Sequence, residues 1–156
     1  MVDLANHLLE ENKPDSALQV LDRMEKELPS YNVPYDMDVM SYYDQRSQKE
    51  RLFCSGGALT TALLYIELDH NEKALPILDE LWNRCDQFLE YYLSLDRVNF
   101  RHSNTNCLKQ FKSMLTLISL YNSIDSTMTN KRYNTLQHRI EQFKLKGGDV
   151  DTVEWQ

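Results

Sequence analysis

Two pairs of alanines with the same spacing constrain the fold of this chain more than any other feature of its sequence. Ala5 and Ala17 are twelve residues apart, and so are Ala62 and Ala74. In each copy large apolar residues follow 3, 16 and 19 positions after the first alanine: Leu8, Leu21 and Met24, then Tyr65, Leu78 and Leu81. Small residues let two helices approach closely, while large ones fill the layer between them. The spacing therefore predicts two helical hairpins, over residues 2–29 and 57–95.

The rest of the chain is also predicted to be helical. The 156 residues include four glycines and four prolines, and so few turn formers favour long helices. Apolar residues at helical spacing predict a terminal helix pair over residues 104–146, which Gly147 and Gly148 end. We therefore expect an all-α fold of about six helices, stacked as antiparallel hairpins in one domain over residues 1–148. Residues 30–56 are expected to form an irregular insertion, and residues 149–156 a poorly ordered acidic tail.

The arrangement of the two hairpins resembles the tetratricopeptide repeat. The second-helix alanines, Ala17 and Ala74, are 57 residues apart, whereas that repeat has a period of about 34 residues. The excess of about 23 residues corresponds to the stretch 30–52. Asp86 stands where the first copy has Pro29, so the second hairpin is expected to end in a longer helix. The resemblance implies a short stack of repeats with a concave binding face.

A narrower resemblance covers nearly the whole chain. It rests on the strings Lys13-Pro14-Asp15-Ser16-Ala17, Tyr31-Asn32-Val33-Pro34-Tyr35-Asp36, Asn71-Glu72-Lys73-Ala74 and Glu90-Tyr91-Tyr92-Leu93-Ser94-Leu95, in this order. Together they resemble the C-terminal region of a family of multi-spanning Bacteroidetes membrane proteins, whose N-terminal part is similar to GT-C glycosyltransferases of the protein O-mannosyltransferase type. The resemblance implies an extramembrane fragment of an inner-membrane protein, on the periplasmic side or, alternatively, in the cytoplasm. The membrane spans and any catalytic acidic residues are then expected upstream of Met1.

Charge and composition disfavour several classes of function. The formal charge of −7 opposes the counterion release that drives most nucleic-acid binding. No apolar stretch reaches the roughly 18 residues that a membrane span needs. The three cysteines have no Cys-x-x-Cys spacing and the four histidines lack the i, i+4 pairing of a zinc helix: Cys54, Cys85, Cys107, His7, His70, His102 and His138. We therefore expect no catalytic residue, metal, cofactor, nucleic-acid partner or membrane span in this fragment.

Tyrosines supply the candidate binding residues. The chain has nine of them, and a tyrosine ring can be buried while its hydroxyl contacts a peptide or sugar. The residues selected are Tyr35 with the adjacent Asp36, and the pairs Tyr42–Tyr43 and Tyr91–Tyr92. The alternative is that one tyrosine of each pair belongs to the core and the other to its rim. Asp36, for its part, is equally well placed to cap a following helix.

One residue is a candidate for modification. In bacteria of the kind named above, periplasmic O-glycosylation is associated with Asp, then Ser or Thr, then a residue such as Ala, Val or Thr. Three triplets fit: Asp15-Ser16-Ala17, Asp125-Ser126-Thr127 and Asp151-Thr152-Val153. The first two are also what a helix start or turn requires, so Thr152 is the preferred acceptor.

These observations favour a binding role. The function expected is a non-catalytic protein-interaction or scaffolding domain, which binds a protein partner or the acceptor of an upstream membrane enzyme. The alternative is a purely structural module that docks on its own membrane region or dimerises. A glycan-processing activity of the domain itself would need two inward carboxylates in one cleft, for which the sequence gives little support. The oligomeric state is left open.

Overall fold

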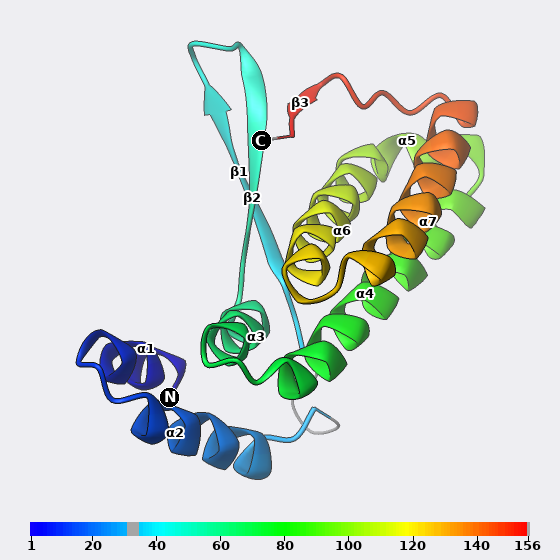
Figure 1. Cartoon of the computed structure of the whole chain (residues 1–156). Coiled ribbons are helices and arrows are strands. Elements are labelled where there is room, and N and C mark those ends of the chain that lie inside the picture. Colours follow the sequence, from blue (N-terminus) through cyan, green and yellow to red (C-terminus); the bar gives the residue numbers. More distant parts are fainter. Residues whose placement is uncertain (31–34, 156) are drawn as a thin grey trace. The chain divides into compact units, whose positions relative to one another are not determined.

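Helices dominate the structure, a computed structural model that describes residues 1–30 and 35–155 (Figure 1). The seven helices of this part of the chain are α1 (Val2–Glu10), α2 (Pro14–Glu27), α3 (Gly57–Glu67), α4 (Asn71–Ser94), α5 (Arg97–His102), α6 (Asn104–Ile124) and α7 (Ser126–Leu145). The three strands are β1 (Asp38–Asp44), β2 (Lys49–Ser55) and β3 (Val153–Glu154). The predicted all-α class is thus confirmed, with a small sheet added to it. No helix of the described residues is both long enough and apolar enough to cross a membrane.

The chain forms two compact units, where the sequence suggested one helical domain over residues 1–148. The first unit comprises Met1–Met37 and Ser55–Leu81, and the second comprises Asp38–Cys54 and Trp82–Gln156. Helix α4 contributes its first part to one unit and the remainder to the other.

The first unit packs through its alanines, as the spacing predicts. Ala5 on α1, Ala17 on α2, Ala62 on α3 and Ala74 on α4 are all 0% exposed. Helix α1 packs against both α2 and α3. Pro14 is the first residue of α2, where its missing N–H costs no helical hydrogen bond. The small side chains of Ala5 and Ala17 thus lie buried where α1 and α2 pack, and small residues let helix backbones come together.

The second unit has its core between long helices. Helices α6 and α7 pack against each other, and α5 packs against α6. Phe143 of α7 is fully buried, with its ring centroid 5.7 Å from that of Phe100 and 5.3 Å from that of Phe111. Helix α7 ends where expected, because Gly147 adopts the left-handed φ of 87° and its N–H bonds to the Lys144 carbonyl.

The prediction of an irregular insertion over residues 30–56 is wrong for its second half, which forms the hairpin of β1 and β2. The two strands are joined by four residues, a link short enough to require antiparallel pairing. Successive side chains of a strand point to opposite faces of the sheet, and β2 shows this alternation of burial. Leu52 is 2% exposed, whereas its neighbour Phe53 is 42% exposed. The turn carries no Gly, Pro or Asn, and Gln48 takes the left-handed φ of 55° instead. The usual sequence signal for a hairpin is therefore missing.

The expectation of a poorly ordered tail over residues 149–156 is also wrong for residues 149–155. In these residues β3 pairs in parallel with β2, with Glu50 opposite Val153 and Arg51 opposite Glu154. The sheet order is β1-β2-β3, and Val153 is 3% exposed. Burial of Val153 against the second unit fixes a segment whose charge alone suggested solvation.

Candidate functional site

A cavity of about 270 Å³ in the first unit contains two of the residues selected from the sequence. Its wall is formed by Val2 from α1, Met24 from α2, Leu28, Tyr35 and Asp36, together with three residues at the start of α3. Tyr35 is half-buried, whereas Asp36 is exposed. This Tyr35 pocket is mostly apolar and open to solvent at Leu28, whose exposure is 49%.

The start of α3 leaves room for the Tyr35 pocket because its residues are small. Gly57, Ala58 and Thr61 line one side, and a Cβ added at Gly57 would meet nothing within 4 Å. The Thr61 hydroxyl donates a hydrogen bond to the Gly57 carbonyl at 2.7 Å, so its polar atom is satisfied within the helix. The pocket therefore offers a surface suited to an apolar side chain of a ligand.

Charged groups surround the buried Tyr65 of α3 in the same unit. Its hydroxyl donates to Asp22 Oδ1 of α2 at 3.3 Å, and Lys73 of α4 binds the same oxygen. The Lys73 Nζ also lies 5.6 Å from the centroid of the Tyr65 ring. A buried tyrosine hydroxyl needs such a partner, so Asp22 and Lys73 hold α3 in position.

The Tyr35 pocket lies in a negative electrostatic environment. Burial raises the pKa of Tyr35, and the carboxylates of Glu25 and Glu80 raise it further. Burial likewise raises the pKa of Glu25, an effect that its hydrogen bond from Tyr65 and the charge of Lys73 oppose. The pKa of Tyr65 is also raised, first by burial and then by Glu25 and Asp22. Both tyrosines therefore keep their protons at neutral pH and remain hydrogen-bond donors.

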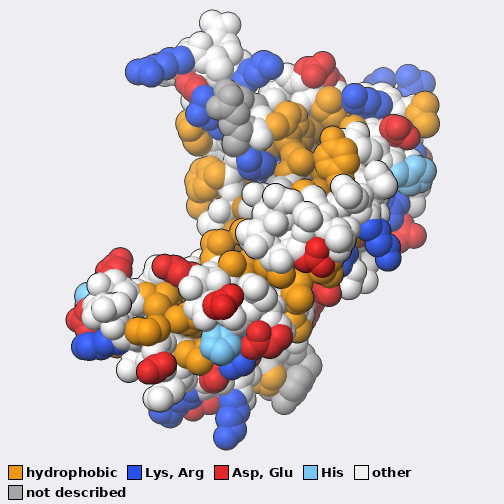
Figure 2. Space-filling model, in the orientation of Figure 1, with side chains coloured by type: hydrophobic (Ala, Val, Ile, Leu, Met, Phe, Trp, Pro, Cys, Tyr) orange, Lys and Arg blue, Asp and Glu red, His pale blue; other side chains and the backbone are white. Residues whose placement is uncertain are grey.

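The first unit as a whole has an excess of acidic residues. Its two segments contain 13 Asp and Glu residues against 4 Lys and Arg residues, a net charge of −9. The lower part of Figure 2, which carries α1 and α2, shows acidic side chains around hydrophobic ones, with Lys and Arg side chains at its left and bottom edges. An acidic surface with an apolar pocket attracts a ligand that combines apolar and basic groups.

The other selected tyrosines lie elsewhere, in the second unit. Tyr42 and Tyr43 are on β1 and are 52% and 63% exposed, with the Tyr42 ring centroid 6.3 Å from that of Phe53. Tyr91 of α4 is 59% exposed, and Tyr92 is half-buried. The centroids of their two rings are 5.4 Å apart. The core-and-rim alternative thus describes Tyr91–Tyr92 partly and Tyr42–Tyr43 not at all, because both members of the latter are exposed.

Two further expectations concern single residues. Asp36 does not cap a helix, because β1 follows it, and its Oδ1 accepts a hydrogen bond from the Met37 N–H at 2.9 Å. Thr152 is exposed just before β3, and its hydroxyl donates to the Asp149 carbonyl at 3.3 Å. Its exposure leaves it accessible, and its modification remains a prediction.

The described residues hold no group of three or more His, Cys, Asp or Glu side chains placed to bind a metal ion. The three cysteines, all within the described ranges, form no disulfide with one another, and Cys107 is fully buried. Burial raises the pKa of the Cys107 thiol to about 11, so it is protonated at neutral pH. Such a thiol is a poor nucleophile.

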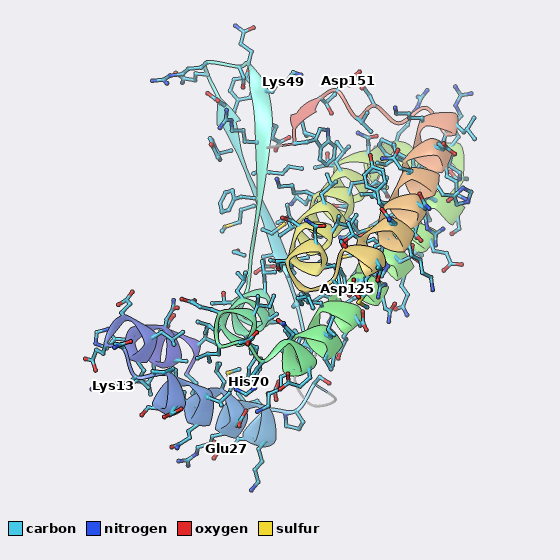
Figure 3. The ribbon with its side chains drawn as sticks, in the orientation of Figure 1. Lys13, Glu27, Lys49, His70, Asp125 and Asp151 are labelled. Carbon is cyan, nitrogen blue, oxygen red and sulfur yellow. The ribbon has the colours of Figure 1, made fainter. Side chains whose placement is uncertain are left out.

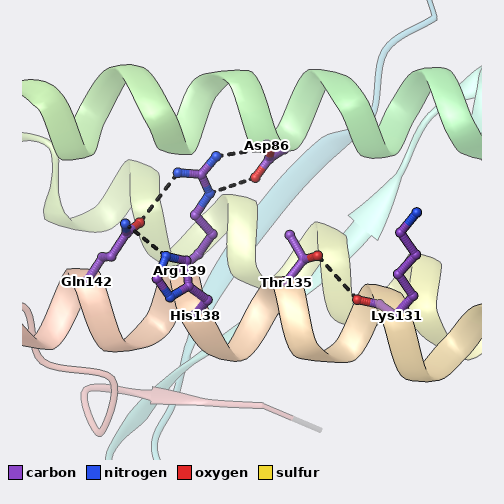
Figure 4. A network of polar contacts seen from close by, with 6 residues as sticks. All are labelled: Asp86, Lys131, Thr135, His138, Arg139 and Gln142. Carbon is purple, nitrogen blue, oxygen red and sulfur yellow. Dashed lines mark hydrogen bonds and ion pairs between the residues drawn. The ribbon is translucent and has the colours of Figure 1, made fainter.

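A polar network between α4 and α7 in the second unit is structural (Figure 4). Arg139 donates from Nε and Nη2 to the two carboxylate oxygens of Asp86, at 2.7 and 3.0 Å, and this contact raises the Arg139 pKa. Gln142 accepts from Arg139 Nη1 at 3.4 Å and contacts His138. These groups satisfy one another, and the fork-like Arg–carboxylate contact fixes the two helices together.

No protein-family model, curated protein or solved structure matches this chain.

Most of the Tyr35 pocket was missed by the sequence analysis. Met24 was named only for its spacing from Ala5, and Leu28 was not among the residues selected. An apolar helix face wider than the neighbouring helix covers leaves residues free to line a pocket, and this width is a signal in the sequence. Tyr65 was predicted to fill the layer between helices, and a buried tyrosine hydroxyl needs a polar partner. The sequence alone does not show that Asp22 is this partner and that Lys73 binds the same carboxylate oxygen.

Proposed function

We propose that the chain is a non-catalytic protein-interaction module whose first unit binds a partner segment in the Tyr35 pocket. The observation that carries this proposal is an open, mostly apolar pocket of about 270 Å³ within a unit of net charge −9. The partner segment is apolar at its centre, where it enters the pocket, and carries Lys or Arg beside it. Basic flanking residues accelerate encounter with the acidic unit and fix the register of the segment.

The contacts of Tyr35 support a role in recognition. Its protonated hydroxyl lies near the carboxylates of Glu25 and Glu80, and its ring forms part of the pocket wall. A ligand ammonium or guanidinium that reaches these carboxylates is stabilised by them, while the apolar part of the ligand contacts the ring. Rigid tyrosines provide such mixed contacts with little loss of side-chain entropy.

A structural module that dimerises through this unit is the less favoured alternative. Two copies of the first unit carry −9 each, and like charges across an interface oppose association. The membrane-protein setting implied by the resemblance stays a prediction, as does the side of the membrane.

A peptide-library selection tests the proposal. The full chain is used as bait for displayed random peptides, in parallel with an Ala58→Trp variant, which fills the pocket, and a Tyr43→Ala variant, which alters an exposed residue outside it. We expect enrichment of peptides with an apolar residue flanked by Lys or Arg, retained by Tyr43→Ala and lost with Ala58→Trp. Enrichment that Ala58→Trp leaves unchanged, or enrichment of acidic peptides, would contradict the proposal.

A further inference from the structure

The C-terminal tail is held on the second unit at two kinds of surface. Strand β3 pairs with the edge of β2 and buries Val153, which is 3% exposed. Trp155 lies over the groove between α6 and α7, and its indole Nε1 donates to the Val150 carbonyl at 3.0 Å. An extended segment therefore already occupies a sheet edge and an apolar groove of this unit.

The tail fits this surface incompletely. Its pairing with β2 covers Glu50 and Arg51, two of the seven residues of that strand. A cavity of about 280 Å³ also remains beside the tail, lined by Val150, Trp155, Phe111, Leu115, Tyr133 and Ile140. Side chains that line an unfilled space lose dispersion contacts on that side. A segment with larger apolar groups would thus be held more strongly than the tail itself.

The tail and the unit on which it docks carry charges of opposite sign. Residues 149–156 carry three acidic side chains and no Lys or Arg, whereas the rest of the second unit carries 13 Lys and Arg against 8 Asp and Glu. The tail sequence thus has a charge of −3, and the remaining residues of the unit on which it docks have a net charge of +5. In Figure 3 Asp151 lies on the tail just before β3, and Lys49 begins the strand with which β3 pairs.

The tail can leave without disturbing the helical core. Helix α7 is closed by the bonds of Gly147 N–H to the Lys144 carbonyl and of Gly148 N–H to the Phe143 carbonyl. Residues 149–155 follow Gly148 directly, and so short a tether to the core gives an effective concentration on the order of millimolar. A weakly fitting tail therefore stays docked, yet a better ligand replaces it.

We propose that this surface is a receptor for an extended acidic segment of a partner protein, which the chain's own tail occupies as a replaceable internal ligand. The partner segment adds a parallel strand to the edge of β2 and places an apolar side chain where Val153 lies. A second large apolar side chain takes the place of Trp155 and fills the adjacent cavity. This mode of recognition takes affinity from main-chain pairing and specificity from alternate side chains.

Binding of a tail peptide to the full chain tests this inference. The probe is a fluorescein-labelled peptide with the sequence of residues 149–156, and its anisotropy is followed with the wild type and with a Val153→Asp, Trp155→Ala double variant. The double variant releases the tail, so we expect it to bind the peptide at least about tenfold more tightly than the wild type does. The matched control Thr152→Ala, altered at an exposed position of the same tail, should behave like the wild type.

Three results would overturn the inference. They are equal binding by the wild type and the double variant, no binding by either, and unchanged binding of a peptide whose acidic residues are replaced by lysine. A wild-type dimer that grows with concentration and is lost in the double variant would assign the surface to tail exchange between two copies instead. Far-ultraviolet circular dichroism checks that the helices persist, and Trp155→Ala alone replaces the double variant if they do not.

Discussion

Substitution of Gly148 by alanine tests the packing of the second unit. A Cβ at Gly148 would lie 2.4 Å from two carbons of the Phe143 ring, whereas carbon atoms in contact are separated by about 3.5–4.0 Å. The ring is fully buried between Phe100 and Phe111. Because the two neighbouring rings hold it in place, a shift of more than about 1 Å must come from the end of α7 or from the core.

The expected cost of Gly148→Ala follows from this geometry. Overpacking of a core costs about 1–3 kcal/mol. A loss of about 2 kcal/mol in the free energy of unfolding lowers the thermal midpoint of a chain of this size by roughly 4–8 °C. Replacement of Phe143 by leucine removes the ring atoms that clash, so in a Phe143→Leu background Gly148→Ala should cost less than about 0.5 kcal/mol.

Urea unfolding followed by circular dichroism measures both values. Gly57→Ala is the matched control, because its added Cβ meets nothing within 4 Å and alanine favours the helix that begins there. We expect Gly57→Ala to unfold at the same or a higher urea concentration than the wild type. A loss below about 0.5 kcal/mol for Gly148→Ala, or equal losses in the wild-type and Phe143→Leu backgrounds, would refute the packing argument.

Three further predictions follow from single groups. Because the pKa of Glu25 is raised above its ordinary value of 4.5, its ionisation costs stability as pH rises through that raised pKa, so the stability gained by Glu25→Gln should increase between pH 4 and pH 7 in urea unfolding. Hydrogen bonds from Thr127 at the start of α7 lower the pKa of Asp125. Replacement of Asp125 by alanine should lower the melting midpoint at pH 7, and replacement by serine should lower it less. The difference in melting midpoint between the wild type and the alanine variant should vanish at pH 2. Half-exposed Cys54 should react with iodoacetamide before buried Cys107, as peptide mass spectrometry would show; equal rates would contradict the assigned burial.

Helical packing could be predicted from the sequence because it depends on local periodicity and residue size. The spacing of the alanines indicates where helices approach one another, and all four are fully buried: Ala5, Ala17, Ala62 and Ala74. Gly147 marked the end of α7 by its conformational freedom alone. The helix contacts and the end of α7 depend on residues that are close together in the sequence, so a single sequence is enough to predict them.

The sheet and the Tyr35 pocket could not be predicted in this way. The β1–β2 turn lacks the usual turn residues, and β3 is ordered by a pairing between residues about a hundred positions apart in the sequence. Tyr35 and Asp36 were selected as candidate residues, but the walls contributed by Val2 and Ala58 come from segments that only the fold brings together. The charge of −9 is visible only when the two segments of the first unit are counted together.

A titration followed by nuclear magnetic resonance tests the central claim most directly. The most enriched peptide from the library selection is added to the full ¹⁵N-labelled chain, and the amide signals of Gly57, Ala58 and Thr61 are compared with those of Val153 and Trp155. If the Tyr35 pocket binds the peptide, we expect saturable shifts at its three residues, weakened by added salt and lost in Ala58→Trp. Shifts confined to the tail and β2, or none at the start of α3, would contradict binding in this pocket.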